Sequence, residues 1–202
     1  MVVFVVAFIA IVYSTYKNGN TEAKEKEIAN EVAETLEVIT KFEKPDFERA
    51  NNQTFINSVS QCVEYIYNTT TDVYPVNFEV LLAQAALESG WGNSRFALEG
   101  KNLFGIRTYD LREPHMLPSN NPKKWGVKVY VHECDSVLHY INTLNNGTAF
   151  GKYQELRDAG ETDAFVLLET LDAYASDKDY FAKIRSIIKK IRSDYKINTI
   201  EE

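Results

Sequence analysis

The sequence has few of the residues that build metal centres and disulfide frameworks. Two cysteines and three histidines are spread over 202 residues, and no CxxC, HExxH or Cys–His pattern joins them. These counts argue against a metal site, and they predict no cofactor. Cys62 and Cys134 lie far apart along the chain, so they either form one disulfide or remain two buried free thiols.

The sequence also lacks an excess of basic residues. Lys and Arg number 22 against 29 Asp and Glu, which gives a formal net charge of −7. A nucleic-acid partner would require a basic surface. Adhesion to an anionic lipid or wall polymer through charge alone would also require one. We therefore expect no nucleic-acid partner.

Long hydrophobic runs are absent except at the N-terminus. Residues 2–13 are apolar, and no charged residue appears before Lys17. A membrane span needs roughly 17 residues as a lower limit, and this run approaches that length only with the three residues after it. The basic start and the small-residue cleavage site of a secretory signal are missing. We predict a short membrane anchor at 1–16; a buried strand of a soluble core is the alternative.

The composition changes sharply after the hydrophobic run. Residues 17–45 are rich in glutamate, and apolar residues recur among them at spacings of three and four, which places them on one side of a helix. This stripe consists of Ile28, Val32, Leu36 and Ile39. Pro45 ends the pattern. We expect a helical stalk, either solvated along its length or paired with a second copy.

The remaining residues, 46–202, have the pattern of one mainly α-helical domain. Apolar residues recur at helical spacing over most of this range. The exception is Val127–Val131, where the alternation is typical of a strand and predicts one arm of a small β hairpin. The chain is long enough to bury a core without metals or disulfides.

One segment places an isolated acid at the end of an apolar helix. The helix is expected to begin after Asn77, a suitable N-cap, and to stop at Gly90, which favours a left-handed C-terminal turn. Glu88 is the only acid between Glu79 and Glu99. Apolar surroundings and the negative end of the helix dipole both raise the pKa of a carboxyl group. Such an acid can protonate a leaving glycosidic oxygen; an ordinary exposed glutamate at a helix end is the alternative.

Two segments resemble glycoside hydrolase family 73, the β-N-acetylglucosaminidase domains of bacterial autolysins and flagellar assembly proteins. Residues 83–107, AQAALESGWGNSRFALEGKNLFGIR, follow the family pattern AQxxxESGWGxS and then NLFGIK. Residues 174–184, YASDKDYFAKI, follow its pattern YATDPxYAxKI. The resemblance extends over about residues 53–192.

The resemblance implies a lysozyme-like fold, with a substrate groove between a helical lobe and a small β lobe. It implies that Glu88 is the general acid and that Tyr174 lies across the groove. It also implies that the substrate is the glycan of peptidoglycan, on the outer side of the membrane. The candidates for groove walls or for support of the acid are Trp91, Asn102, Phe104 and Tyr109. Without the family, Trp91 and Phe104 are interpreted as core aromatics.

One departure from the family concerns the second carboxylate. The family usually supplies it from the β hairpin, and the matching position here is near Gly126, which is no acid. Glu113 is the nearest upstream glutamate, and Asp110 and Glu133 are other options. A distant carboxylate would activate water. Alternatively, the N-acetyl group of the substrate acts as nucleophile with the help of Tyr174, which is the route we favour.

We therefore predict a membrane-tethered endo-β-N-acetylglucosaminidase of peptidoglycan, with the catalytic domain at 46–202. A lytic transglycosylase is a second interpretation, because that class also has a lysozyme-like fold and a glutamate before a serine. It continues with a Gly-rich GLMQ-type segment, however, where this chain has NLFGI. A non-catalytic wall-binding module is the third interpretation.

Overall fold

The computed structural model describes residues 26–34, 43–119, 124–172, 174 and 178–196. The chain divides into two compact units, 1–43 and 44–202, which are taken separately. In the first unit, residues 26–34 form a helix in which Ile28 and Val32 are half-buried and the other side chains are exposed. The predicted anchor at 1–16 lies outside the described residues. Among the helices that the structure does describe, none is long and apolar enough to cross a membrane.

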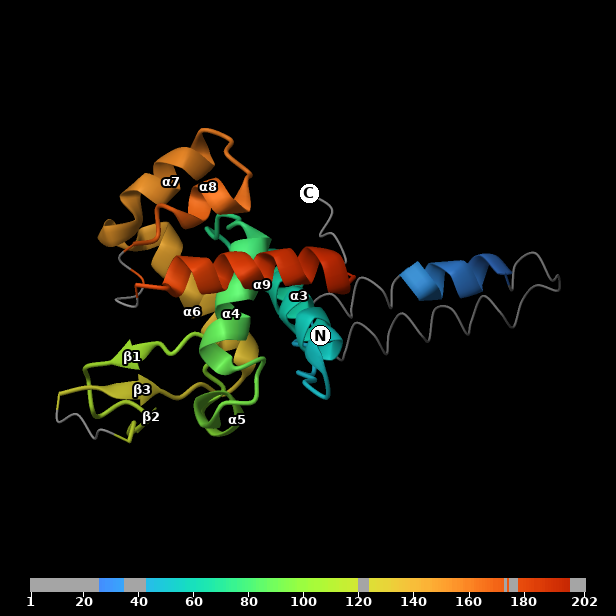
Figure 1. Ribbon diagram of the computed structural model, residues 1–202. Coiled ribbons are helices and arrows are strands. Elements are labelled where there is room, and N and C mark those ends of the chain that lie inside the picture. The colour runs from blue at the N-terminus through green and yellow to red at the C-terminus, as the bar shows by residue number, and fades with distance from the viewer. Residues whose placement is uncertain (1–25, 35–42, 120–123, 173, 175–177, 197–202) are drawn as a thin grey trace. The chain divides into compact units, whose positions relative to one another are not determined.

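The second unit is mainly helical, with a small antiparallel sheet (Figure 1). Its helices are α3 (Asn52–Thr69), α4 (Phe78–Ser89), α5 (Arg95–Gly100), α6 (Glu133–Asn146), α7 (Gly151–Asp158), α8 (Ala164–Leu168) and α9 (Tyr180–Asp194), with a 3₁₀ turn, η1 (Thr148–Phe150). Its strands are β1 (Arg107–Thr108), β2 (His115–Met116) and β3 (Gly126–Lys128). The prediction of a mainly α domain with a small β part is confirmed.

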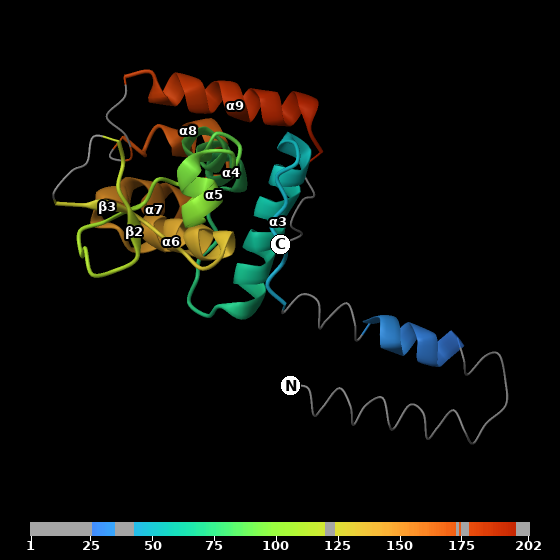
Figure 2. The same cartoon turned by 90° about the horizontal axis from the view of Figure 1, so that it is seen from below.

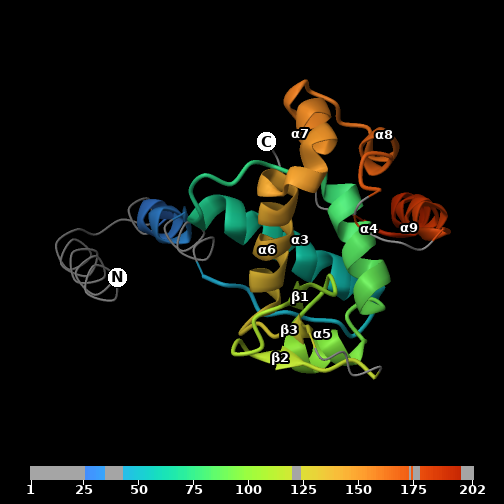
Figure 3. The same ribbon diagram turned by 90° about the vertical axis from the view of Figure 1, so that its left-hand side faces the viewer.

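Helix α4 is the central helix of this unit. It packs against α8 and α9, and α3 packs against α6. Figure 3 shows α4 between α6 and α9, and the view from below shows α3 and α9 flanking it (Figure 2). Every residue from Val80 to Ala86 is buried. A helix that is apolar on all sides requires such a position.

Both predicted ends of α4 are confirmed. The side chain of Asn77 accepts a hydrogen bond from the backbone N–H of Val80 at 3.0 Å, as an N-cap does. Gly90 has a φ of 58° and a ψ of 50°, the left-handed conformation that glycine adopts at helix C-termini. The helix therefore stops within the first motif, one residue after Glu88.

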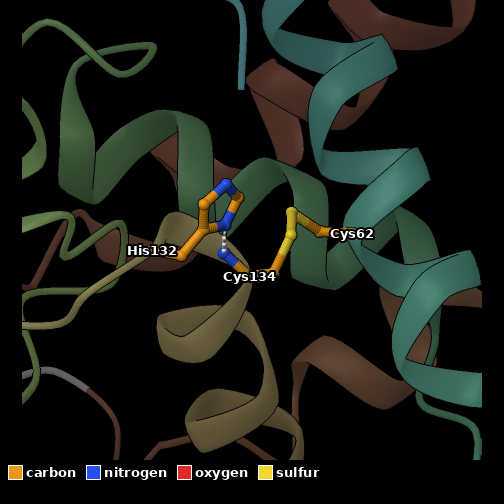
Figure 4. A group of neighbouring side chains, drawn as sticks. All are labelled: Cys62, His132 and Cys134. Atoms are coloured by element: carbon orange, nitrogen blue, oxygen red, sulfur yellow. Dashed lines mark hydrogen bonds between the residues drawn. A yellow bond between two sulfur atoms is a disulfide. The ribbon is translucent and has the colours of Figure 1, made fainter. Parts of the chain in front are cut away.

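A disulfide and a pair of ionic contacts hold the start of α6 in place. Cys134 forms a disulfide with Cys62 of α3, which decides between the two alternatives left by the sequence (Figure 4). The neighbouring Glu133, with only 3% of its side chain exposed, pairs with Arg49 and lies 3.2 Å from Lys101 Nζ. Arg49 also donates to two backbone carbonyls of the first motif's region, at 3.4 and 3.2 Å. These bonds join α3, α6 and the segment that follows α4.

The β lobe is a three-stranded antiparallel sheet of order β1-β3-β2, where the sequence predicted a hairpin. The middle strand β3 pairs with both neighbours. It ends at Lys128, short of the predicted end at Val131, because the next backbone groups bond outside the sheet. The N–H of Val129 donates to Pro114 O and that of Tyr130 to Gly100 O, both at 2.9 Å. The sheet contacts α5 through β2 and β3.

Candidate active site

Glu88 lies in the last turn of α4, and the residues after it build a tight turn. The buried hydroxyl of Ser89 donates to a carbonyl of the preceding helical turn at 2.6 Å and accepts from the N–H of Gly92 at 2.7 Å. Gly92, with a φ of 80°, lies so close to Phe55 that a Cβ there would be 2.9 Å from the ring. Gly90 has open space where a Cβ would be. The serine and the glycines thus end the helix one residue beyond the acid.

The carboxyl of Glu88 is reachable from solvent and partly desolvated at the same time. The side chain is exposed, but the atoms packed around its carboxyl raise the pKa above the ordinary value by burial. A hydrogen bond from the Tyr180 hydroxyl opposes this rise in part. Gly105, from the second half of the first motif, lies beside the carboxyl: a Cβ there would be 3.7 Å from Glu88 Oε2. A raised pKa suits a general acid that must meet a large substrate.

The structure brings Tyr174 to the same place as Glu88. Its hydroxyl donates to the backbone carbonyl of Phe104 at 3.3 Å. Its ring centroid lies 5.9 Å from that of Tyr140 and 6.1 Å from that of Tyr180. Burial raises the pKa of Tyr174, and the nearby tyrosines and the charge of Glu88 raise it further. The two sequence motifs, far apart in the chain, therefore meet at one site.

Asn102 is a structural residue of the loop beside the acid. Its side chain is 1% exposed and makes four hydrogen bonds to the backbone. Its Nδ2 donates to the carbonyls of Ile106 and Lys128 at 2.9 and 2.8 Å. Its Oδ1 accepts from the N–H groups of Phe104 and Ile106 at 3.2 and 3.1 Å. Because these bonds use both donors and both acceptor positions, Asn102 holds the loop against β3 and has no bond left for a sugar.

Two of the three predicted aromatic groove residues, Trp91 and Phe104, pack against other rings. Phe104 is 3% exposed and stacks on Tyr140 with a centroid distance of 4.2 Å. Trp91 is half-buried, with ring centroids 5.9 Å from Phe55 and 5.8 Å from Tyr195. Both positions match the core interpretation of these aromatics. Phe104 still contributes to the site, since its carbonyl accepts from the Tyr174 hydroxyl.

The β lobe presents an exposed aromatic, Tyr109, and a carboxylate with a lowered pKa, Glu113. Tyr109, just after β1, is 71% exposed. Glu113, between β1 and β2, accepts hydrogen bonds from Lys128 Nζ at 2.9 Å and from the Thr108 hydroxyl at 2.8 Å. These two donors hold the pKa of the Glu113 carboxyl below its usual range. An ionised carboxylate suits a base or a stabiliser of positive charge, and it does not suit an acid.

The other two candidates for a second carboxylate, Asp110 and Glu133, are both engaged in ion pairs. Asp110 pairs with Arg112 of its own loop at 2.6 Å, which lowers its pKa. Glu133 is buried at the start of α6, between its two cationic partners. At Gly126 a Cβ would lie 2.5 Å from the His115 ring, so this backbone leaves no space for a longer side chain.

One group of potential metal ligands exists among the described residues. The ligand atoms of Cys62, His132 and Cys134 lie within 4.8 Å of one another (Figure 4). The two sulfurs are joined as a disulfide, and His132 Nδ1 accepts from the Cys134 N–H at 3.1 Å. A disulfide offers no thiolate, which is the form of cysteine that binds metals. This group therefore supports no metal site in its present form.

Sequence reasoning missed three residues that contact or support Glu88. They are Gln84, Gly105 and Tyr180. Gln84 had a detectable signal, because a residue four positions before Glu88 lies on the same face of the helix. Gly105 and Tyr180 are motif positions, but no local pattern shows that they reach the acid.

Comparisons with known proteins agree with this site. The model of the family "Glucosaminidase: Mannosyl-glycoprotein endo-beta-N-acetylglucosaminidase" matches residues 64–193. The exo-glucosaminidase LytG of Bacillus subtilis is 29% identical over 174 residues, which cover 81% of this chain and 60% of that protein. The peptidoglycan hydrolase FlgJ of Vibrio parahaemolyticus is 28% identical over 182 residues, which cover 82% and 53%. The chain thus spans little more than half the length of these relatives.

A solved structure supports the same relationship. The catalytic domain of the autolysin Auto from Listeria monocytogenes has a TM-score of 0.54 and 27% sequence identity, over 74% of this chain and 87% of that one. The family match covers more than half of the chain and includes both motifs. The chain belongs to the glucosaminidase family, glycoside hydrolase family 73.

Proposed function

We propose that this chain is an endo-β-N-acetylglucosaminidase that hydrolyses the glycan strands of peptidoglycan, with Glu88 as its general acid. The observation that supports this most directly is the carboxyl of Glu88. It is solvent-accessible and has a raised pKa, and it lies where the two motifs of a glucosaminidase family meet. Relatives named as glucosaminidase and peptidoglycan hydrolase support the choice of substrate.

In the proposed reaction, Glu88 gives its proton to the glycosidic oxygen as the sugar leaves. The N-acetyl group of the same substrate attacks the anomeric carbon, and water later opens the cyclic intermediate with Glu88 as base. This route needs a single protein acid. Among the described carboxyl groups with a shifted pKa, that of Glu88 is raised, whereas those of Asp110, Glu113 and Asp194 are lowered. Tyr174 would orient the acetamido group.

The proposed location is outside the cytoplasm. The disulfide between Cys62 and Cys134 supports it, because such bonds persist in oxidising compartments. The segment 1–16 would tether the domain to the membrane. Fractionation of cells that express the full chain tests this: the protein should stay with the membranes and be sensitive to protease added from outside.

Digestion of purified peptidoglycan by the full chain tests the activity. We would compare the native protein with Glu88→Gln and with Glu99→Gln, a matched change of an exposed glutamate on α5. The products would be reduced with borohydride and identified by mass spectrometry. We expect reduced N-acetylglucosamine ends from the native protein and from Glu99→Gln, and none from Glu88→Gln. Anhydro-muramic ends would instead identify a transglycosylase, and binding without release would identify a wall-binding module.

An exo-acting glucosaminidase is the second candidate, because one relative is named as such. The two modes differ in the time course of the products. An endo enzyme shortens the glycan strands at once while free N-acetylglucosamine stays scarce. An exo enzyme releases the free sugar from the first minutes and shortens the strands slowly. Free sugar released in proportion to the total cleavage would replace the endo assignment.

The substrate-assisted route has its own test. Glycan whose N-acetyl groups have been removed should resist cleavage, because it lacks the internal nucleophile. Glu113→Gln should retain most of the activity, and the first product should keep the anomeric configuration of the substrate. If the deacetylated glycan is cut and Glu113→Gln is inactive, a second carboxylate takes part and Glu113 is that residue.

A further inference from the structure

Three neutral polar side chains form a connected network behind Glu88. Gln84 lies one helical turn before the acid in α4 and is completely buried. Its Nε2 donates to the hydroxyl of Tyr180 in α9 at 2.8 Å, and its Oε1 accepts from the hydroxyl of Tyr140 in α6. The Tyr180 hydroxyl also hydrogen-bonds the Glu88 carboxyl. Three helices therefore contribute to one chain of hydrogen bonds that ends at the acid.

The structure assigns a direction to each bond in this network. A tyrosine hydroxyl has one proton, and an amide donates only through its nitrogen. The Tyr140 proton points to Gln84 Oε1, which turns the Gln84 nitrogen towards Tyr180. The Tyr180 oxygen accepts from that nitrogen, so its own proton is available for Glu88. With the buried amide in this orientation, Tyr180 acts as a donor towards the carboxyl.

We propose that Gln84, Tyr140 and Tyr180 are positioning residues that decide which oxygen of Glu88 holds the catalytic proton. This inference rests on the proposed role of Glu88 as general acid. The carboxyl oxygen that accepts from Tyr180 is occupied, so the proton resides on the other oxygen. That oxygen then donates to the glycosidic oxygen of the substrate. The network also stabilises the carboxylate after the proton has left.

Apart from burial, hydrogen bonding is the main influence on the pKa of Glu88. From α9 the titratable group is Tyr180, and from the segment before α9 it is Tyr174. Tyr140 of α6 bonds to Gln84 and acts through it. Burial raises the pKa of all three tyrosines, so they stay neutral over the working range of pH. Helix α8, which also packs on α4, consists of apolar residues.

The test is the pH profile of the full chain with Tyr180→Phe, which removes the hydroxyl and keeps the ring. The upper limb of kcat/KM reports the ionisation of the essential acid in the free enzyme. Without its donor the carboxylate is less stable, so this limb should move up by about one pH unit. With the proton no longer confined to one oxygen, kcat at the optimum should fall about tenfold while KM changes little.

Two more variants separate positioning from general damage. Gln84→Met should move the same limb upward by a smaller amount, and it should add nothing in the Tyr180→Phe background, because both changes act through one bond. Tyr67→Phe is the matched control: that half-buried tyrosine loses a hydroxyl that accepts from the Val76 N–H at 3.0 Å. The upper limb of the kcat/KM profile of Tyr67→Phe should stay at the native pH.

The outcomes distinguish this inference from the proposed function. Suppose that Glu88→Gln is inactive and that the upper limb stays in place in both Tyr180→Phe and Gln84→Met. The positioning role of the network is then refuted, and the role of Glu88 as general acid is retained. If Glu88→Gln is active, the proposed function fails. The network is then judged by NMR titration of the Glu88 carboxyl, and an unchanged pKa in Tyr180→Phe overturns it. If Tyr180→Phe does not fold, the pH profile and the NMR titration are carried out on Gln84→Met and Tyr140→Phe, and the same outcomes decide.

Discussion

Removal of the disulfide between α3 and α6 should cost the domain a large part of its stability. The perturbation is the double variant Cys62→Ala, Cys134→Ala. The bond closes a loop of 72 residues in the unfolded chain. In the chain-entropy description, closing such a loop stabilises the folded state by about 4 kcal/mol at room temperature. Small domains are stable by only about 5–15 kcal/mol, so this loss is a substantial fraction of the total.

Thermal unfolding followed by circular dichroism measures the effect. For a domain of this size, each kcal/mol shifts Tm by about 3 °C, so the double variant should unfold roughly 12 °C below the native protein. The native protein with a reductant should unfold at about the temperature of the variant. A thiol titration of the unfolded, unreduced protein should find no free thiol. A variant whose Tm stays within about 2 °C of the native value would refute the loop-entropy reasoning.

Three further predictions concern single residues. Glu133→Gln should lower the free energy of unfolding by about 3 kcal/mol in a urea titration, because it leaves the half-buried Arg49 without its ionic partner. Asn102→Ala should cost about 2 kcal/mol and broaden the NMR signals of the β lobe, since it leaves backbone groups of the loop unpaired; unchanged signals would argue against this role. Burial raises the folded-state pKa of Glu88 above its ordinary value of 4.5, so ionisation disfavours the folded state as pH rises through that range. Glu88→Gln should therefore raise Tm at neutral pH, and this gain should vanish near about pH 4.

The sequence predicts local features of the fold well and tertiary partners poorly. The two ends of α4 depend on the chemistry of Asn77 and Gly90 alone, so they were predictable. The strand at 127–131 was predicted from its alternation, which continues to Val131. That side chain is 93% exposed, and the Tyr130 N–H bonds to Gly100. Alternation shows which residues suit a strand, but not which backbone groups will meet them.

The same distinction holds at the site. The motifs led to Glu88 and Tyr174 as candidates, because a family pattern marks them directly. Asn102 was predicted from the family resemblance as a candidate for a groove wall or for support of the acid. Only the folded chain shows that its four hydrogen bonds all go to the backbone. The network behind the acid could not be predicted, because Gln84 and Tyr140 are 56 residues apart and no local rule pairs them.

The disulfide and the ion pairs at the start of α6 have a consequence for native-state hydrogen exchange. Helices ordinarily fray at both ends, and their terminal amides exchange first. Here Glu133 is held by ion pairs and Cys134 by a covalent bond to α3. Opening of this end would separate charges in the interior while the disulfide still restrains the chain. The amides near Cys134 should therefore exchange as slowly as those in the middle of the helix, and local opening of α6 should begin at Asn146.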